Sequence, residues 1–327
     1  MIAKQRQNGL VERPTSLHSG TILTVILLIA GILFPLLFAS NAYLLNVATI
    51  VLIFAITGSS WNLLGGYAGQ PSFGHAAFFG VGAYTFAVLF PNGGPWTLPG
   101  FLIAGIAASI VALPIGMLIF RLRGPYFALS MLAFAEILRL VAQNLTSVTM
   151  GASGFLLSPT LDSKLAHYYL ALGALAVLLA ITAYMAVSRP GFYFLAIRED
   201  QDVAGALGVN IVAYKMLALT ISAFFTGLAG AIYANYFAYI EPNVVFSVVE
   251  VSLATYLIAV LGGMGTILGP LIGSIVLASV GEVLRVYTGT GNILFYGILI
   301  VVVVLFMPDG VMGMLQSRRR RQPGTAA

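Results

Sequence analysis

Long apolar runs, separated by short polar segments, cover most of the 327-residue chain. A helix of about 20 apolar residues can cross the roughly 30 Å hydrocarbon core of a bilayer. The pattern predicts about ten such helices, at residues 20–39, 43–63, 76–90, 98–120, 126–145, 167–187, 216–238, 246–261, 271–284 and 291–308. We therefore expect an all-α, polytopic membrane protein in which some helices are short or broken. Its single membrane domain covers residues 20–310.

The positive charges predict how this bundle is oriented, because Lys and Arg gather in cytoplasmic loops. If the N-terminus is cytoplasmic and all ten runs cross, the outer side receives only Lys164 and Arg285. The inner side receives twelve positive charges: Lys4, Arg6, Arg13, Arg121, Arg123, Arg189, Arg198, Lys215, Arg318, Arg319, Arg320 and Arg321. Both termini, residues 1–19 and the basic tail 311–327, are therefore predicted to be cytoplasmic.

Composition agrees with this class of protein. Hydrophobic residues make up 60% of the chain and charged residues 8%, against about 25% charged in soluble domains. The net charge of +5 follows from the loop asymmetry and the arginine tail, which favours anionic lipid head groups rather than nucleic acid. The first apolar run is longer than the core of a secretory signal peptide, so we interpret it as an uncleaved span.

Candidate catalytic chemistry is scarce. The chain has no cysteine, and its three histidines, His18, His75 and His167, lie far apart in the sequence. No phosphate-binding GxxxxGK[ST] loop and no nucleophile elbow occurs. The sequence therefore predicts no catalytic residue, no metal site and no cofactor on this chain, and it does not predict ATP hydrolysis.

A glycine-rich break separates the second and third runs, at residues 65–75. Non-helical backbone near a membrane is tolerated where protein or a water-filled cavity satisfies its polar groups. If the helix restarts near Ser72, its free N–H groups point toward any anionic group in a path. The candidate path residues are Gln70, Pro71, Ser72, Phe73, Gly74 and His75. A tight connecting turn, with glycines chosen for packing, is the alternative.

A second break, at residues 261–270, also begins with Leu-Gly-Gly. Small residues spaced four apart allow helices in membranes to approach closely. We therefore interpret this break as a packing feature. Its glycines are Gly262, Gly263, Gly265, Gly269 and Gly273. The two breaks do not correspond under a division of the spans into two halves, so they do not indicate an internal repeat.

Two charges fall within a predicted span. Glu136 and Arg139 are three residues apart, so they share a helix face and are expected to pair. Charges at membrane depth cost on the order of 2.5–3.5 kcal/mol each, which makes them candidates for function as well. A proton-driven carrier needs an unpaired acidic group in its core, and the sequence offers no good one.

Six of the chain's 25 charged residues lie within the segment 188–215, between two apolar runs. Acidic residues followed by Gly208 predict a short helix, and Asn210 is placed to cap the next one. Val203, Ala204 and Leu207 are expected to form a small apolar face on the short helix. A helix this short is marginal alone in water, so contact with a partner would explain it. A solvated connector is the alternative.

Five segments together resemble the LivM-type permeases of branched-chain amino-acid ABC transporters. Asp202-Val203-Ala204-Gly205-Ala206-Leu207-Gly208 is similar to the EAA-xxx-G loop of ABC importers, with Asp in place of Glu and Val in place of the first Ala. The Ile-x-Leu-Pro ending of the general EAA pattern is missing after Gly208. The other segments are residues 66–75, Arg123-Gly124-Pro125-Tyr126-Phe127-Ala128, Ala196-Ile197-Arg198-Glu199-Asp200 and Leu261-Gly262-Gly263-Met264-Gly265.

This resemblance implies a pump in a bacterial cytoplasmic (inner) membrane. Its other parts would be a second, LivH-like permease, two LivF/LivG-like cytoplasmic ATPases that bind ATP and Mg, and an external substrate-binding protein. The residues implied to couple this chain to the ATPases are Arg198, Glu199, Asp200 and Asp202, through polar contacts, and Ala204 and Gly208, through close approach. Related permeases for urea, short amides or aromatic acids are alternatives. A self-sufficient secondary carrier or channel is the alternative from another class.

Overall fold

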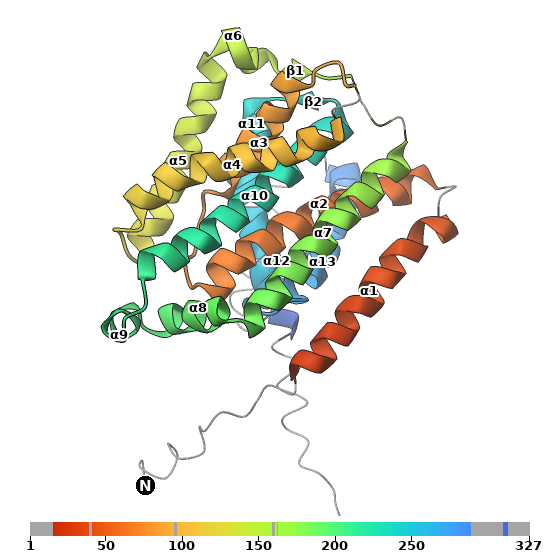
Figure 1. Ribbon diagram of the computed structural model, residues 1–327. Helices are drawn as coiled ribbons and strands as arrows, with labels where there is room; N and C mark the ends of the chain where they lie inside the picture. The colour runs from red at the N-terminus through yellow and green to blue at the C-terminus, as the bar shows by residue number, and fades with distance from the viewer. Residues whose placement is uncertain are drawn as a thin grey trace, which may run out of the picture.

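Helices dominate the computed structural model, which describes residues 16–38, 41–94, 97–158, 161, 163–288 and 310–312 (Figure 1). The elements are α1 Ser16–Phe38, α2 Ala42–Trp61, η1 Asn62–Tyr67, α3 His75–Leu89, α4 Thr97–Ile119, α5 Pro125–Asn144, α6 Thr146–Thr149, η2 Gly151–Ser153, β1 Phe155–Leu156, α7 Lys164–Val187, α8 Arg189–Glu199, α9 Gln201–Ala206, α10 Ile211–Phe237, β2 Tyr239–Ile240, α11 Pro242–Val245, η3 Val248–Leu253, α12 Ala254–Gly262 and α13 Gly269–Thr288. Strands β1 and β2 form one short antiparallel pair.

Six helical stretches are long and apolar enough to cross a membrane. They are Ala42–Tyr67, Thr97–Ile119, Pro125–Asn144, Lys164–Val187, Ile211–Phe237 and Pro242–Gly262. Three shorter apolar helices are Leu23–Phe38, His75–Leu89 and Gly269–Gly281. The predicted all-α membrane class is confirmed for the described residues. The count of ten spans and the cytoplasmic termini stay predictions, because the run at 291–308 and most of both terminal segments lie outside those residues.

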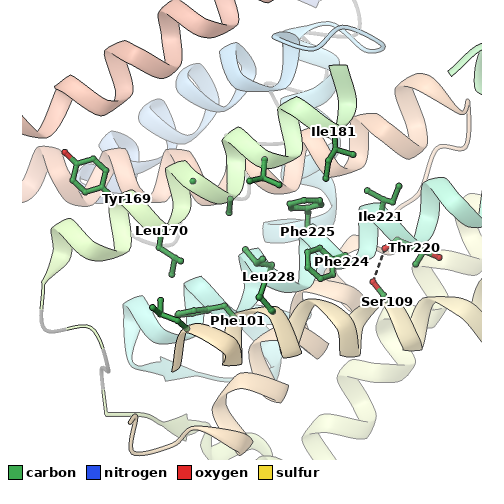
Figure 2. Close-up of a pocket in the computed structure, with 15 residues that line it drawn as sticks. Phe101, Ser109, Tyr169, Leu170, Ile181, Thr220, Ile221, Phe224, Phe225 and Leu228 are labelled. Atoms are coloured by element: carbon green, nitrogen blue, oxygen red, sulfur yellow. Dashed lines mark hydrogen bonds between the residues drawn. The ribbon is translucent and has the colours of Figure 1, made fainter. Parts of the chain in front are cut away.

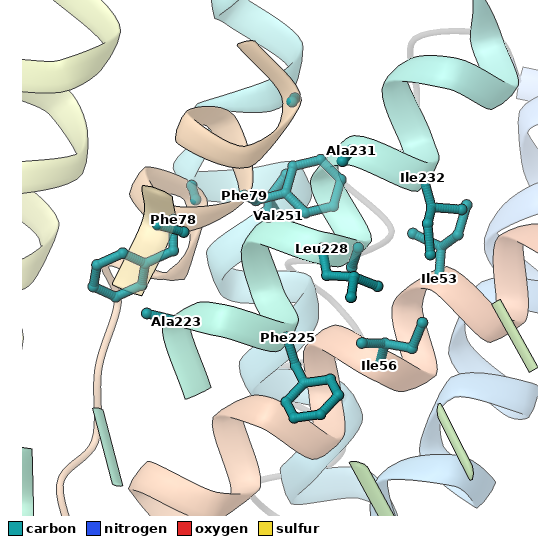
Figure 3. Packing of buried hydrophobic residues seen from close by; sticks show 14 of the residues in the cluster. Ile53, Ile56, Phe78, Phe79, Ala223, Phe225, Leu228, Ala231, Ile232 and Val251 are labelled. Carbon is teal, nitrogen blue, oxygen red and sulfur yellow. The ribbon is translucent and has the colours of Figure 1, made fainter. Parts of the chain in front are cut away.

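Helix α10 occupies the centre of the bundle and packs against α2, α3, α4 and α7. A helix that is apolar on every side belongs in the interior, and about two thirds of the most apolar window of α10 is buried. Figure 3 shows Phe225, Leu228 and Ile232 of α10 beside Ile53 and Ile56 of α2. The core therefore forms around α10, and the other spans are positioned relative to it.

Glycines set how closely α3 and α10 approach. A Cβ atom on Gly82 of α3 would lie 2.0 Å from the carbonyl oxygen of Gly227, and one on Gly230 of α10 would lie 2.0 Å from that of Phe79. In a membrane, where the hydrophobic effect does not bring helices together, such close approach provides much of the packing energy. The contact between α3 and α10 therefore depends on the absence of side chains at these positions.

We expect Gly230→Ala to lower the thermal stability of the purified protein, because the added methyl group forces backbone apart at a cost of about 1–3 kcal/mol. The same substitution at Gly173 of α7, where a Cβ would meet nothing within 4 Å, is expected to be neutral or to stabilise by up to about 1 kcal/mol. Unfolding temperatures of the two variants in detergent provide the comparison. Equal temperatures would contradict this view of the α3–α10 contact.

Helix α1 lies on one flank of the bundle and contacts α7 and α2 (Figure 1). Pro35 lacks an N–H group, so the carbonyl of Gly31, four residues earlier, has no donor within the helix. The hydroxyl of Tyr168 in α7 donates to this carbonyl at 2.7 Å, and the Tyr168 ring stacks on Phe34. The proline thus creates a polar group on α1 that α7 satisfies, and this bond fixes where α1 docks.

Tyr168→Phe is expected to loosen α1, because the Gly31 carbonyl then lacks a donor in a site that is nearly free of water, at a cost of about 1–3 kcal/mol. Tyr169→Phe is the matched control. Tyr169 donates to the Ile32 carbonyl at 3.2 Å. That carbonyl also has a donor within the helix, the N–H of Leu36, so it does not depend on Tyr169. Amide hydrogen exchange along α1 should rise in the first variant much more than in the second. A similar rise in both would show that the proline plays no part.

Candidate functional site

The charged segment folds as an elbow of two helices at one end of the molecule, opposite α6, β1 and β2 (Figure 1). A single residue, Asp200, separates α8 from α9. Its carboxylate caps α9 by accepting from the backbone N–H groups of Asp202, at 2.8 Å, and Val203, at 3.1 Å. Gly208, with φ of 86°, ends the turn after α9, and Asn210 caps α10 through the N–H of Ala213. The predicted short helix is therefore present as α9, but it is shorter than the stretch 198–207, because Asp200 caps it and Arg198 and Glu199 belong to α8.

Helix α9 is held against the bundle by polar contacts of its own chain. Asp202 pairs with Arg123 at 3.0 Å, in the loop between α4 and α5, and both side chains are exposed. Gln201 accepts a hydrogen bond from the Lys215 ammonium at 2.7 Å, and Lys215 is almost fully buried. An exposed ion pair contributes at most about 1 kcal/mol, so the buried Lys215 contact is the firmer of the two.

The apolar face expected on α9 is divided in the structure. Val203 is 56% exposed and Leu207 is 80% exposed, whereas Ala204 is 2% exposed. At about 100° per residue the three side chains lie within one arc of the helix, with Ala204 at the edge of the arc that turns toward the bundle. They share a face as expected, but the bundle covers Ala204, and Val203 and Leu207 form the outward apolar surface of α9.

The first glycine-rich break begins later than its sequence suggests. The helix of α2 continues through Gly65 and Gly66 as the π-helical turn η1, and α3 starts at His75 rather than near Ser72. Between them, Gln70 and Ser72 are buried and Pro71 is exposed. The carbonyl of Ser72 accepts from the Trp61 indole at 2.6 Å. Buried side chains thus satisfy polar backbone groups of the break. The π-helical turn η1 is also of a kind that is frequent at functional sites.

The amino end of α3 is closed to a ligand in this conformation. The N–H of Ala76 donates to the Ser252 hydroxyl at 2.9 Å, and that of Ala77 donates to the Gly74 carbonyl at 3.0 Å. The expected free N–H groups are therefore occupied by the protein itself. Phe73, another path candidate, is half-buried and packs its ring edge against Tyr256.

His75, the last path candidate, lies fully buried in contact with α10. Its Nε2 atom is 2.9 Å from the Ser222 hydroxyl, which donates its only proton to the carbonyl of Ser60 at 2.7 Å. Nε2 must therefore carry the imidazole proton and donate it to Ser222. Nδ1 is then a buried acceptor with no hydrogen-bond partner among the described residues.

The two glycine-rich breaks contact each other. Asn62, in η1, accepts from the N–H of Gly265 at 2.7 Å and donates to the carbonyl of Thr266 at 2.8 Å. A Cβ on Gly66 would lie 2.6 Å from the nitrogen of Gly265, so the backbones touch. The shared Leu-Gly-Gly sequences thus mark two segments that meet in space, although they do not mark a repeat.

Arg198 joins the charged segment to both breaks. Its Nη1 atom donates to the carbonyl of Gly66 at 2.7 Å, and the same nitrogen lies against Gly265, where a Cβ would come within 2.7 Å. We call the contact among η1, residues 263–266 and Arg198 the junction. The structure therefore brings together three of the predicted segments, and Arg198 lies where they meet.

These motifs belong to a chain that is matched along most of its length by one family model. That model describes the permease component of branched-chain amino acid transport systems, and it covers residues 43–307. The chain belongs to this permease family. The predicted resemblance to LivM-type permeases is thereby confirmed, and α1 lies before the matched region.

Relatives of the permease carry both names of the expected pair. This chain is 29% identical to the high-affinity branched-chain amino acid permease protein LivM of Escherichia coli K12, over 92% of this chain and 77% of that protein. It is 26% identical to LivH of Salmonella typhimurium LT2, over 82% and 94%. A probable LivM of Methanocaldococcus jannaschii is 24% identical over 80% and 90%.

The two charges of α5 in this permease form the expected pair, since Arg139 donates two hydrogen bonds to the Glu136 carboxylate. A further Arg139 nitrogen donates to Asn243 at 2.8 Å, and Gln143 donates to the same oxygen at 2.6 Å. These bonds connect α5 to α11, away from the junction. Both charges are therefore used in fastening two elements together.

The glycines of the second break lie in tight contacts. A Cβ on Gly262 would lie 1.7 Å from the carbonyl oxygen of Gly269, and one on Gly269 would lie 2.3 Å from that of Gly263. A Cβ on Gly273 would lie 2.0 Å from the carbonyl oxygen of Ile258. Helices α12 and α13 thus pack backbone against backbone, as the packing interpretation of this break expects.

A groove of about 770 Å³ lies elsewhere on the permease, among α4, α7 and α10 (Figure 2). Its lining is almost wholly apolar and includes Phe101, Leu170 and Phe224. The hydroxyl of Ser109 is already bonded to the carbonyl of Thr220 at 3.0 Å. The groove therefore suits an apolar chain and offers little to the charged ends of an amino acid.

Sequence reasoning missed Asn62, Ser222 and Ser252, which link the junction and the end of α3 to the rest of the bundle. Each is a small polar residue within an apolar run, and buried polar groups are normally hydrogen-bonded. That rule could have identified them as candidates. It could not have paired Asn62 with Gly265, which lies 203 residues away.

We expect Asn62→Leu to loosen the junction, because Gly265 and Thr266 lose their partner together, at a cost of about 1–3 kcal/mol for each unsatisfied group that stays buried. Amide exchange at residues 263–266 should rise and the unfolding temperature should fall. Asn144→Leu is the control, because the Asn144 amide donates to the Leu140 carbonyl of its own helix and to no other group among the described residues. If the amides of residues 263–266 exchange no faster in Asn62→Leu than in the unmodified chain, Asn62 does not hold the junction.

Proposed function

We propose that this chain is the membrane-spanning permease subunit of an ATP-driven importer for branched-chain or related neutral amino acids. The observation that carries the proposal is the family match over residues 43–307, which includes the junction and the α8–α9 elbow. The relatives named LivM and LivH support a pair of permease subunits. Two LivF/LivG-like ATPases that bind ATP and Mg, and an external binding protein, complete the assembly.

The elbow has the properties that a docking site for the ATPases needs. The elbow exposes three acidic side chains, those of Glu199, Asp200 and Asp202. Val203 and Leu207 add an exposed apolar surface beside them. Interfaces combine an apolar centre with a polar rim in this way. Gly208 leaves open space beside the apolar pair, since a Cβ there would meet nothing within 4 Å. In this scheme the elbow lies in the cytoplasm of a bacterial cell, and ATP binding moves it to switch the permease between outward and inward openings.

The path of the substrate involves the first glycine-rich break. Gln70, Ser72 and His75 are buried in this conformation, so they line a path only when the bundle opens. Permeases for urea, short amides or aromatic acids would use the same architecture. A self-sufficient carrier or channel would require transport by this polypeptide alone.

Purification of the tagged chain from its native membrane in mild detergent tests the assembly. Two ATPase polypeptides and a second permease should accompany it, and ligand binding by the external protein would then identify the substrate. A chain that purifies alone and transports in vesicles would contradict the proposal.

Leu207→Asp is expected to reduce the recovery of ATPases with the chain at least about tenfold, since a buried charge without a partner costs several kcal/mol at an interface. Leu156→Asp is the matched control, because Leu156 is 79% exposed at the opposite end of the molecule. Quantitative protein gels of the purified complexes provide the measurement. Full recovery of ATPases with Leu207→Asp would place their docking site elsewhere.

A further inference from the structure

We infer that Arg198 is a positioning residue that transmits movement of the α8–α9 elbow to the helix breaks of the junction. The inference rests on the proposed function, because it assigns a task within an ATP-driven cycle. It differs from the role implied by family resemblance, in which Arg198 contacts the ATPases directly.

The hydrogen bond from Arg198 has a clear electrostatic reason. Gly66 lies at the carboxyl end of the Ala42–Tyr67 span, where helix carbonyls lack partners and carry partial negative charge. The Arg198 guanidinium satisfies the Gly66 carbonyl at 2.7 Å. A charged donor makes this bond stronger than a neutral one. Helix α8 therefore supplies the cationic cap of a membrane span that ends 131 residues earlier in the chain, at Tyr67.

Steric contacts make the position of Arg198 specific. A Cβ on Gly69 would lie 2.9 Å from the Cα and Cβ atoms of Arg198, and one on Gly265 would lie 2.7 Å from its Nη1. The backbone of α8 thus rests on the first break, while the guanidinium lies between the first break and the second. A shift of α8 by about one ångström would lengthen the hydrogen bond beyond its normal range.

The elbow is built to deliver such a shift. Phe194 and Ile197 of α8 are 1% exposed, so α8 is packed into the bundle rather than lying loosely on it. Asp200 is the only residue between α8 and α9, and its side chain caps α9. A force on α9 therefore reaches Arg198 within two residues, and Asn62 continues the connection from η1 to Gly265 and Thr266.

Opening of the junction would separate the ends of α2 and α12. In the closed arrangement Asn62 joins these ends by two hydrogen bonds, and Arg198 caps the end of η1 by a third, with its guanidinium against Gly265. Movement of the elbow would remove the Arg198 bond first and leave the Gly66 carbonyl without its charged donor, beside the Asn62 pair. Arg198 thus links the ATPase cycle to the state of the breaks.

The test compares Arg198→Gln with Arg189→Gln in the complete complex, reconstituted in lipid vesicles. Arg189 begins the same helix and is exposed, so its substitution removes the same charge without touching the junction. We expect Arg198→Gln to keep its ATPases and its ATP hydrolysis. Substrate uptake per ATP should fall about tenfold, within the usual range of coupling between sites. Arg189→Gln should behave like the unmodified complex, and Arg198→Lys should recover part of the loss.

A second measurement follows the junction directly. Amide exchange at residues 263–266 should rise at least about tenfold in Arg198→Gln and not in Arg189→Gln, and the effect should be non-additive with that of Asn62→Leu. Unchanged uptake per ATP, or unchanged exchange at these amides, would overturn the inference. Loss of the ATPases from Arg198→Gln alone would also overturn it, because Arg198 would then be a docking residue. If the unmodified chain purifies without ATPases, the proposed function fails instead, and the exchange measurement still decides whether Arg198 holds the junction.

Discussion

Every break in a membrane helix leaves backbone N–H and C=O groups that water cannot reach, and another part of the protein has to satisfy them. This requirement determines much of the architecture. Tyr168 satisfies the carbonyl freed by Pro35, Ser252 satisfies the N–H of Ala76 in the first turn of α3, and Asn62 and Arg198 satisfy backbone groups of the junction. In each case the partner is a side chain from a different helix, so the same bonds that satisfy the backbone also fix how the helices are placed.

The requirement also explains how the α8–α9 elbow is connected to the apolar spans of the permease. The hydrogen bonds of the junction are partly shielded from water, where polar groups are well held when paired and costly when unpaired. A packed core deforms little and transmits strain. The family match places this arrangement in a class of proteins in which a chain of this type works as a permease component.

Much of the fold could be predicted from the sequence, because the length of an apolar run is a local signal. Nine of the predicted runs coincide with apolar helices in the described residues, and Asp200, Gly208 and Asn210 were informative about the elbow. The site was predicted only in pieces. Local composition indicated the two breaks and the charged segment, but their contact depends on Asn62 and Arg198 reaching residues more than 130 positions away.

The predictions that failed have a common physical origin. Ala204 was implied to approach a partner closely, because the bundle that covers it could not be seen in the sequence. The restart of α3 was placed at Ser72 because glycine and proline weaken helices, yet η1 carries the α2 helix through Gly65 and Gly66 as a π-turn. Tertiary contacts decided both cases against local propensity.

The Pro35–Tyr168 contact has a consequence for how the protein is made. Helix α1 is synthesised before α7, and the hydroxyl that its Gly31 carbonyl needs is 137 residues further along the chain. At roughly 5–20 residues per second, a ribosome takes about 7–27 s to reach it. During that interval α1 can contact α2 but lacks its Tyr168 donor, and the freed carbonyl has to be shielded by water, a lipid head group or the insertion machinery. Helix α1 thus reaches its final place only after α7 has been made.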